Sequence, residues 1–451
     1  MINVEIMKVT SLVNGKAVTR TEEKSMEVIN PFNGEVVGKA NLASQEDAER
    51  AIESAHRVFH ESMKKMPAYH RAEILRKTAD LLEERTEEFA RILGLEAGKP
   101  IRDGRGEVGR AVQVLRFAAD EAKKIEGELV PMDAAIGGEN RIGMVRRYPI
   151  GVISAITPFN FPLNLALHKL APACAAGNTV VLKPAGKTPL SSYMLVKLFE
   201  EAGLPMGALN LVIGNGSEIG NVLVTDSRIS KVTFTGSPSV GMNLRKKAGL
   251  KKVTLELGSN SSNIIFNDGD VNAAAVGLVR GAFAFSGQIC ISAQRIYVQR
   301  EVYQTFLDQY VSLVEKLVLG NPMEETTDIG PMISKNEAIR AEEWIQEAVK
   351  AGAKLATGGK REGSLLEPTV LVDVTPNMKV VCEETFAPIV SVIPFDTEEE
   401  VIAMANDSVF GLQAGVFTSD INRAMRVADA LETGGEWINE TPTKSGVLRT
   451  V

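Results

Sequence analysis

The chain has 451 residues, 44% of them hydrophobic and 24% charged, which is the composition of a globular protein of two or three domains. A disordered or collagen-like chain is excluded. The formal net charge of −7 argues against nucleic-acid binding, which needs a basic surface. Three cysteines suit a reducing compartment, and four histidines without a ligand-like pair argue against a metal site.

The N-terminus carries no signal-peptide pattern. The most apolar stretch, residues 149–182, is interrupted by Pro158, Pro162 and Pro172, so it cannot be one membrane helix. We therefore expect a cytoplasmic protein without a membrane segment.

Short strand-like runs up to about Lys39 are followed by amphipathic helical patterns over 44–59, 71–93 and 107–125. Ser44 is a suitable N-cap for the first helix, with Asp47 three residues later. Residues 128–132 and 141–148 are then predicted to form a hairpin around a Gly-Gly loop.

A regular alternation begins after the hairpin. Strand patterns cover 151–156, 179–183, 209–213, 231–234 and 252–257, and helical patterns cover 163–176, 189–202, 217–225 and 239–248. This alternation predicts a doubly wound parallel sheet in an α/β fold. Helices over 271–285, 301–318, 336–351, 398–406 and 421–431, with strands over 371–374 and 389–394, indicate a second α/β domain after Gly258.

Three residues are candidates for covalent chemistry. Cys290, in Gly-Gln-Ile-Cys, suits a thiolate nucleophile, although a lone cysteine is more often a packing residue. Glu256 ends a predicted strand, where it is either a general base or a solvated charge. Asn160, held between prolines in Thr-Pro-Phe-Asn-Phe-Pro, suits an oxyanion donor or a helix cap.

Other residues are candidates for binding a nucleotide. Lys183 at a strand end can reach a ribose or phosphate, and Gly236 and Ser237 open a strand–turn–helix unit whose helix N-terminus suits a phosphate. Glu384 can accept from ribose hydroxyls, and Phe386 can pack against a nicotinamide ring. Each of these has an equally ordinary interpretation as a solvated charge or a turn.

The candidate motifs, taken together in their order along the chain, point to one protein family far more specifically than any single motif does. The motifs TPFNFP, KPA, FTGS with Val-Gly, ELGSN, GQIC and EETFAP occur in the order and spacing of the NAD(P)-dependent aldehyde dehydrogenase superfamily, which the chain resembles from about Val28 to Asn439. The resemblance implies that Cys290 is the nucleophile and Glu256 the base of deacylation. It implies that Asn160 shares the oxyanion hole with the Cys290 main chain. The implied cofactor contacts are Thr157, Pro158, Lys183, Gly236, Ser237, Val240, Glu384 and Phe386.

The same resemblance implies an oxidoreductase that converts an aldehyde to its carboxylate through a thiohemiacetal and a thioester, with no metal. Residues 1–126 and 149–257 would form the dinucleotide-binding domain and 258–432 the catalytic domain. Residues 127–148 and 433–451 would form an oligomerisation element, so a dimer or tetramer is expected. Gly186 stands where NAD-preferring members often carry a glutamate, and Lys187 follows it, so NAD or NADP is expected with NADP favoured.

The end of the chain departs from the family pattern. After Asn439 an aromatic and a Gly-rich run are missing, and Thr441-Pro442-Thr443 leads directly to Lys444-Ser445-Gly446. Two alternatives therefore stay open, a cofactor-independent thiol esterase and an inactive homologue. The candidate substrates are lactaldehyde, glyceraldehyde 3-phosphate and succinate semialdehyde. Arg110 and Arg116 face either a substrate tunnel or solvent.

Overall fold

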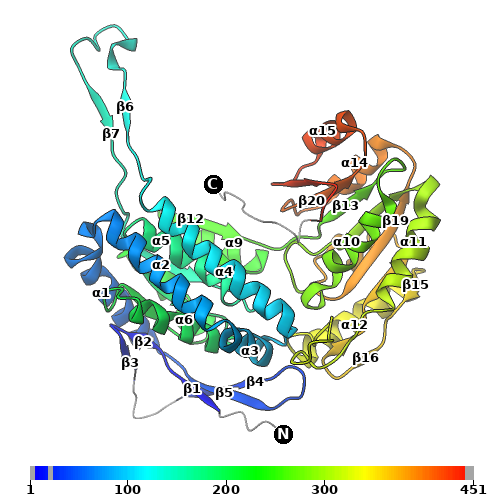
Figure 1. Cartoon of the computed structure of the whole chain (residues 1–451), viewed down its shortest axis with the longest axis horizontal. Helices are drawn as coiled ribbons and strands as arrows, with labels where there is room; N and C mark the ends of the chain where they lie inside the picture. The colour runs from blue at the N-terminus through cyan, green and yellow to red at the C-terminus, as the bar shows by residue number, and fades with distance from the viewer. Residues whose placement is uncertain (1–5, 19–23, 442–451) are drawn as a thin grey trace. The chain divides into compact units, whose positions relative to one another are not determined.

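The computed structural model of the protein describes residues 6–18 and 24–441, which fold as two compact units (Figure 1). The first unit contains the described residues up to Ile29, with Val36–Glu96 and Gly104–Glu256. The second contains Asn30–Glu35, Ala97–Asp103 and the described residues from Leu257 onward. Two short segments of the N-terminal half thus pack with the C-terminal unit, a detail that the sequence-based division does not contain.

The first unit is built on a sheet of seven described strands in the order β12-β11-β8-β9-β10-β2-β3. The strands from β12 to β10 are parallel, and β2 and β3 add antiparallel edge strands. Their bounds are β2 Leu12–Val13, β3 Lys16–Ala17, β8 Val152–Ile156, β9 Thr179–Lys183, β10 Leu209–Leu211, β11 Ile229–Thr235 and β12 Lys252–Glu256. The predicted doubly wound parallel sheet is confirmed.

The strand order of this sheet reverses between β8 and β11. The chain runs outward from β8 through β9 to β10, then returns to place β11 on the other side of β8. Because such crossovers are right-handed, the helices of the two halves cover opposite faces. Accordingly, α5 (Asn164–Ala175) and α6 (Pro189–Glu201) pack with α2, whereas α7 (Gly216–Ile219) and α8 (Val222–Thr225) pack with α1. In doubly wound sheets ligands bind beside this reversal.

Helices and a small sheet precede the hairpin in the chain. The helices are α1 (Gln45–Glu61), η1 (Met63–Lys65), α2 (Ala68–Glu84), α3 (Thr86–Ala97) and α4 (Ile101–Glu121), and the small sheet has the order β1 (Met7–Val9), β5 (Val36–Asn41), β4 (Ser25–Ile29). The predicted cap of α1 is confirmed, since the main-chain nitrogen of Asp47 donates to Ser44 Oγ at 3.3 Å. The single helix predicted over 71–93 is two helices, because the main chain leaves the helical conformation at Arg85 (φ −102°, ψ 24°).

The predicted hairpin consists of β6 (Glu128–Val130) and β7 (Gly143–Val145), with η2 (Met132–Ala134) in the connection. It extends away from the helices of its own unit in Figure 1. Its apolar side chains are open to solvent: Leu129 is 74% exposed, Ile142 84% and Met144 67%. An exposed apolar surface of this kind is typical of a protein–protein contact.

The second unit is built on a sheet of seven described strands in the order β15-β18-β19-β14-β13-β20-β21, all parallel except β15. Their bounds are β13 Ser262–Ile265, β14 Arg295–Gln299, β15 Lys354–Thr357, β18 Thr369–Val372, β19 Ile389–Phe395, β20 Ala414–Phe417 and β21 Glu436–Ile438. The short strands β16 (Arg361–Glu362) and β17 (Leu365–Leu366) pair separately. The predicted second α/β domain is therefore present, with central strands that the sequence analysis did not identify.

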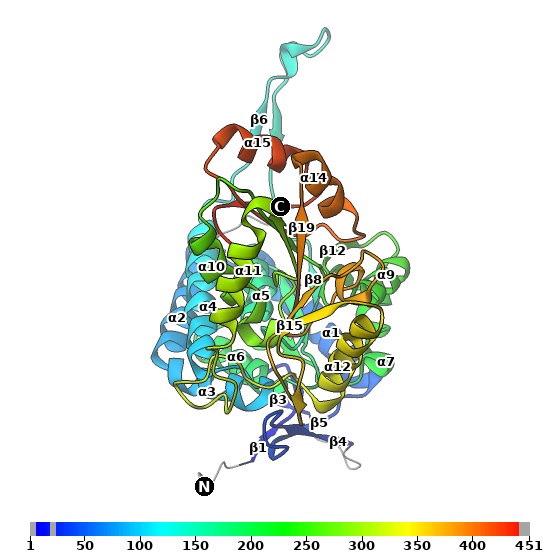
Figure 2. The same cartoon turned by 90° about the vertical axis from the view of Figure 1, so that its right-hand side faces the viewer.

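Alternating side chains of this sheet supply cores on both of its faces. Ile296 and Val298 of β14 pack with α10 (Val271–Phe283) and α11 (Arg300–Val314), whereas Tyr297 packs on the other face. Figure 2 shows β19 running between α10 and α11 on one side and α12 on the other. The remaining helices are α12 Lys335–Lys350, α13 Lys379–Cys382, α14 Glu398–Asn406 and α15 Ile421–Ala430, with η3 (Ala284–Gly287) after α10. Among residues 6–18 and 24–441, no helix has the length and apolar character to cross a membrane.

Candidate active site

In the first unit, predicted site residues gather at the carboxyl ends of parallel strands. The sheet register pairs Ile156 of β8 with Lys183 of β9 and with Phe234 of β11, and it pairs Thr235 of β11 with Glu256 of β12. The loop that carries Asn160 directly follows Ile156. Residues from four separate strand ends therefore share one edge of the sheet, beside the reversal of strand order.

Asn160 lies in the loop 157–163 that connects β8 to α5, and its side chain is 3% exposed. The loop ends at a buried carboxylate from α4. Glu107 Oε1 accepts hydrogen bonds from the main-chain nitrogens of Leu163 (3.1 Å) and Asn164 (3.0 Å). A carboxylate in this position satisfies unpaired donors at the helix N-terminus and complements its dipole. The sequence analysis did not single out Glu107, because its partners lie more than fifty residues away.

Lys169 of α5 is a second residue that the sequence analysis missed. It is 6% exposed, and its Nζ donates to Thr235 Oγ1 at 2.7 Å. Burial lowers its pKa to about 8, while the nearby Glu256 carboxylate opposes this shift. Glu256 is half-buried at the end of β12. A buried lysine and a candidate base thus interact at the sheet edge that also carries Asn160.

The turn after β11 has the backbone expected of a phosphate-binding segment. The main-chain nitrogen of Gly236 donates to Glu256 O at 3.0 Å, and a Cβ at this position would lie 2.6 Å from the Phe234 ring. Ser237 precedes α9 (Pro238–Lys247) and forms no capping hydrogen bond with it. The first N–H groups of α9 can therefore bind an anion. Val240 is 46% exposed on the first turn of α9.

Lys183 is buried at the end of β9, and burial lowers its pKa. The main-chain nitrogen of Thr157 donates to Lys183 O at 3.1 Å, so the start of the Asn160 loop is tied to this strand end. Thr157 is buried and Pro158 half-buried beside it. Gly186 lies three residues further, and a Cβ there would approach Met26 Cε to 3.3 Å. These residues all lie at the edge of the first sheet where its parallel strands end.

In the second unit, predicted site residues gather at the amino ends of the strands. Cys290 precedes β14, and Glu384 and Phe386 precede β19. These strands are neighbours, and Arg295 at the start of β14 pairs with Ser391 of β19. Because parallel strands begin at the same edge of a sheet, the three candidates come from one edge.

The three cysteines have different environments. Cys290 is half-buried, as a nucleophile that must meet a substrate requires. Cys174 is buried in α5, and burial raises the pKa of its thiol to about 12 although Arg71 opposes the shift, so it is an inert packing residue. Cys382 is exposed at the end of α13.

Glu384 lies against the turn that follows β12. Its carboxylate accepts a hydrogen bond from the main-chain nitrogen of Ser259 at 3.1 Å. A Cβ on Gly258 would lie 2.1 Å from Glu384 Oε2, so this contact requires glycine. Burial raises the pKa of Glu384 to about 7, against the opposing effects of the Ser259 N–H and Arg340. The side chain therefore titrates near neutral pH.

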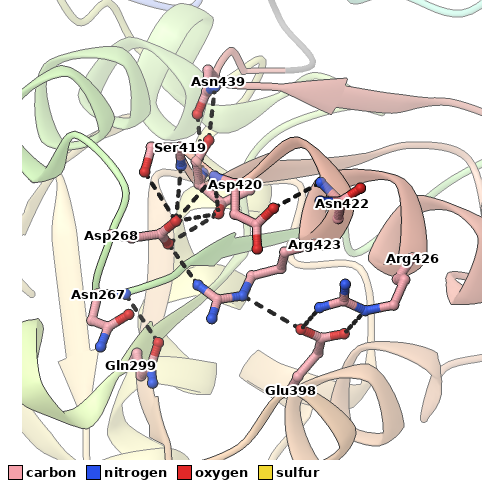
Figure 3. Close-up of polar contacts among 11 residues, drawn as sticks. Asn267, Asp268, Gln299, Glu398, Ser419, Asp420, Asn422, Arg423, Arg426 and Asn439 are labelled. Atoms are coloured by element: carbon pink, nitrogen blue, oxygen red, sulfur yellow. Dashed lines mark hydrogen bonds and ion pairs between the residues drawn. The ribbon is translucent and has the colours of Figure 1, made fainter.

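The opposite edge of the second sheet carries a polar network (Figure 3). Asp268, after β13, accepts hydrogen bonds from Thr418 Oγ1 (2.8 Å) and Arg423 (2.7 Å). Glu398 pairs with Arg423 at 3.4 Å and with Arg426 at 2.9 Å. Asn439 ties the end of β21 to both main-chain polar groups of Thr418, each at 3.0 Å. In the second unit, the carboxyl edge of the sheet thus serves structure, and the amino edge carries the candidate chemistry.

Two further expectations are tested by the side-chain positions. The statement that no histidines form a ligand-like pair was wrong: His56 and His60 lie one turn apart on α1, with their Nε2 atoms 3.3 Å apart. Nevertheless, no group of three or more potential metal ligands occurs among the described residues. Arg116 forms a surface ion pair with Glu83 at 2.6 Å, whereas the Arg110 guanidinium lies 6.0 Å from the Phe161 ring in the Asn160 loop.

A doubly wound sheet with a phosphate-suited turn, joined in one chain to an α/β unit with a half-buried cysteine, defines an enzyme of the dinucleotide-dependent class. Comparison with known proteins gives the family. Residues 18–448 match the model of the aldehyde dehydrogenase family, and the chain belongs to this family. It is an NAD(P)-dependent oxidoreductase that oxidises an aldehyde.

Similar proteins cover almost the whole chain. The 3-sulfolactaldehyde dehydrogenase of Priestia aryabhattai is 48% identical over 95% of this chain and 89% of its own. The lactaldehyde dehydrogenase of Methanocaldococcus jannaschii is 40% identical over 95% of this chain and 91% of its own. The glyceraldehyde-3-phosphate dehydrogenase of the same organism, solved with NADP, has a TM-score of 0.90 and 39% identity over 95% of this chain and 92% of its own.

Proposed function

We propose that this enzyme oxidises a short 2-hydroxyaldehyde with an anionic substituent to its carboxylate, with Cys290 as nucleophile, Asn160 as oxyanion donor and Glu256 as base. The observation that carries the proposal is the convergence of the motifs. Asn160 and Glu256 lie at one edge of the first sheet, although about a hundred residues separate them in sequence, and Cys290 and Glu384 lie at one edge of the second.

The residue types account for the first half of the reaction. The Cys290 thiolate attacks the aldehyde carbon, and the carbonyl oxygen becomes the oxyanion of a thiohemiacetal. The Asn160 side-chain amide and the Cys290 main-chain N–H donate hydrogen bonds to this oxygen. A buried amide in a loop fixed by Glu107 is preorganised for this role, so little reorganisation is needed when the charge develops.

The second half of the reaction releases the acid. After oxidation the substrate is a thioester of Cys290, and Glu256 takes a proton from the attacking water. The Cys290 thiolate then leaves with the electrons of the carbon–sulfur bond, and the carboxylate is free. The position of Glu256, half-buried at the end of β12 on the sheet edge that carries the Asn160 loop, supports this assignment.

The residues of the first unit fit a dinucleotide. Gly236 allows the tight turn beside the Phe234 ring, and the N-terminus of α9 offers unpaired N–H groups. Lys183 ends β9, on the far side of β8 from β11, at the same edge of the sheet. We propose Thr157, Pro158, Ser237 and Val240 as further contacts in this unit, and Glu384 and Phe386 as contacts from the second. When bound, NAD(P)⁺ accepts the hydride of the thiohemiacetal carbon. Gly186 carries no negative charge and Lys187 follows it, so we propose a preference for NADP.

The substrate proposal rests on a shared chemistry. Lactaldehyde, 3-sulfolactaldehyde and glyceraldehyde 3-phosphate, the substrates in the names of the three similar proteins, are all three-carbon 2-hydroxyaldehydes. Two of them carry an anionic group on the third carbon. We propose Arg110 as the residue that meets this group, because its guanidinium stands beside the Asn160 loop and Arg116 is engaged in a surface ion pair.

A substrate panel tests the proposal. Initial rates with lactaldehyde, 3-sulfolactaldehyde, glyceraldehyde 3-phosphate and succinate semialdehyde are compared, each with NAD and with NADP. We expect an anionic 2-hydroxyaldehyde to have the highest kcat/KM, and NADP to exceed NAD. A clear preference for succinate semialdehyde or for uncharged lactaldehyde contradicts the substrate assignment.

We also propose a homo-oligomer, dimer or tetramer, in which the β6–β7 hairpin contacts a second copy. The exposed Leu129, Ile142 and Met144 support this assignment. Replacing the three with serine should lower the mass measured by light scattering, while an unchanged mass contradicts it. The domain roles predicted from sequence remain part of this proposal, with residues 127–148 and 433–451 as the oligomerisation element; residues 442–451, with the departure from the family pattern at 442–446, lie outside the described residues. A cytoplasmic location is proposed because all three cysteines are free thiols.

The two alternatives are not favoured. A cofactor-independent esterase and an inactive homologue would not account for cofactor-suited residues in both units or for similarity to dehydrogenases over nearly the whole chain. Turnover that depends strictly on added NAD(P) distinguishes the dehydrogenase from both.

A further inference from the structure

The main chain just before Cys290 has an unusual conformation. Helix α10 ends at Phe283, and Phe285, Ser286 and Gly287 then have φ values of 48°, 56° and 67°. Side chains rarely adopt this left-handed region, and for a bulky aromatic residue it is strained. Such a turn persists only when its surroundings hold it in place.

Part of the support comes from the turn and its near neighbours in the second unit. Ser286 Oγ donates to Gly330 O at 2.7 Å. Gln288 uses both ends of its amide, donating from Nε2 to Phe285 O at 3.2 Å and accepting at Oε1 from the main-chain nitrogen of Ile333 at 2.8 Å. A Cβ on Gly287 would lie 2.1 Å from Ala387 O, so only glycine fits.

The other support comes from a segment distant in sequence. Ala97–Asp103 connects α3 to α4 and packs with the second unit. Lys99 in this segment is fully buried, and its Nζ lies 4.6 Å from the centre of the Phe285 ring. The Asp103 carboxyl lies close enough to the main-chain N–H of Phe285 for this N–H to lower its pKa. One residue of the strained turn is thus held at its ring by a cation and at its backbone by an anion.

The two charges also balance each other. Asp103 is influenced by Lys99, by Arg102 and by Arg280, whose guanidinium lies 3.8 Å from Asp103 Oδ1. Burial nevertheless raises the pKa of Asp103. A buried charge is tolerated only when it is paired, so removing either partner disturbs the other. The arrangement therefore acts as a unit on Phe285.

We propose that Lys99 and Asp103 are positioning residues that hold the 285–287 turn and thereby set the place and accessibility of the Cys290 thiol. The cation stabilises the aromatic ring of a residue that the backbone alone would not keep in this conformation. The carboxylate fixes the direction of the same peptide group. The catalytic part of this inference rests on the proposed role of Cys290, whereas the structural part concerns only the position of its sulfur.

The test compares Lys99→Met and Lys99→Arg in the full chain. Met keeps most of the volume of the lysine and removes the charge, while Arg keeps the charge. Arg105→Gln is the control, because this nearby arginine pairs with Glu87 at the surface at 2.6 Å. Asp103→Asn is the second variant, since it removes the charge with little change of shape.

Two readouts separate positioning from folding. The first is the rate at which iodoacetamide alkylates Cys290, followed by mass spectrometry of its peptide so that Cys382 does not contribute. The second is the split between kcat and KM together with the Kd for NADP. We expect the alkylation rate of Cys290 and kcat both to fall at least tenfold in Lys99→Met. KM and the NADP Kd should stay within about threefold, and Lys99→Arg should recover most of the loss.

Several results would overturn the inference. One is a Lys99→Met variant with wild-type alkylation and kcat. Another is a loss in which KM, the NADP Kd and the thermal midpoint all change together in Lys99→Met and in Asp103→Asn, because that pattern indicates general destabilisation. The alkylation readout needs no substrate, so it remains informative even if Cys290→Ser keeps activity and the proposed function fails.

Discussion

The Glu107 carboxylate accepts a hydrogen bond from the main-chain nitrogen of Asn164 at 3.0 Å, so a residue of α4 fixes the end of the loop that carries Asn160. Glu107 Oε1 also accepts from Leu163. We expect Glu107→Ala to lower kcat about tenfold or more, because a displaced oxyanion donor stabilises the transition state less. The NADP Kd should stay nearly unchanged.

Glu107→Gln is the matched control for this prediction. Its remaining carbonyl oxygen can accept both main-chain hydrogen bonds, so its kcat should fall much less than that of Glu107→Ala. Equal losses in the two variants would mean that the charge, and not the tether, matters. Stopped-flow measurement of the first turnover is the appropriate assay, since it isolates the step in which the oxyanion forms.

The pKa of Glu384, raised by burial to about 7, predicts a pH dependence of cofactor binding. Below pH 7 the side chain is neutral, and above it the carboxylate can accept hydrogen bonds from ribose hydroxyls. The Kd for NADP should therefore fall as pH rises from 6 to 8. Fluorescence titration of the wild type and of Glu384→Gln checks this, because the glutamine variant should show a flatter profile. A profile that is the same in both proteins contradicts the assignment.

Arg110 and Arg116 lie on the same helix and differ in their partners, which allows a matched comparison. Arg110→Gln should raise KM for an anionic aldehyde about tenfold and change KM for lactaldehyde far less. Arg116→Gln breaks surface ion pairs with Glu83 and Asp80, and such pairs contribute little, so both KM values should remain near wild type. Steady-state kinetics of both variants with the two substrates measures these KM values. An equal effect of the two substitutions would remove Arg110 from the proposed site.

Glu96 predicts how stability depends on pH. Its fully buried carboxyl accepts from the main-chain nitrogens of Leu190 (2.7 Å) and Ser191 (3.1 Å), and burial raises its pKa to about 7, against an ordinary value of 4.5. The folded chain thus holds more protons than the unfolded chain between pH 4.5 and 7. The contribution of Glu96 is complete below pH 4.5 and is lost as pH rises to 7.

The difference in unfolding free energy between the wild type and Glu96→Gln should therefore fall across this window. The expected size is a few kcal/mol, since each pKa unit corresponds to about 1.4 kcal/mol. Urea unfolding of both proteins at several pH values measures it. A difference that is constant with pH, or that grows, would show that Glu96 does not titrate in this way.

Much of the first unit follows from the sequence because its strands are continuous apolar runs. Val152–Ile156 and Thr179–Lys183 are buried throughout and are separated by helices of ordinary length, so both the strands and the parallel sheet could be predicted. The capping box at Ser44 is likewise local. The register that aligns Glu256 with Thr235 could not be predicted from the sequence, because register depends on packing between distant segments.

Two strands of the second unit, β13 and β20, were harder to predict for a physical reason. Strand β13 is only four residues long and begins with Ser262 and Asn263, and β20 contains Gly415. Both are buried through tertiary packing although their own sequences have modest strand propensity. In the same way, Lys99, Glu107 and Lys169 carry no local signal, because their partners are brought to them only by the fold.

The central claim is that Cys290 forms an acyl intermediate that Glu256 releases. The most direct test is a rapid-mixing experiment with Glu256→Gln, NADP and an anionic 2-hydroxyaldehyde. We predict a burst of reduced cofactor close to one equivalent per chain, slow later turnover, and an acyl mass increase on the Cys290 peptide, with neither the burst nor the mass increase in Cys290→Ser. Hydride transfer that continues in Cys290→Ser, or a covalent acyl group on another residue, would contradict the account.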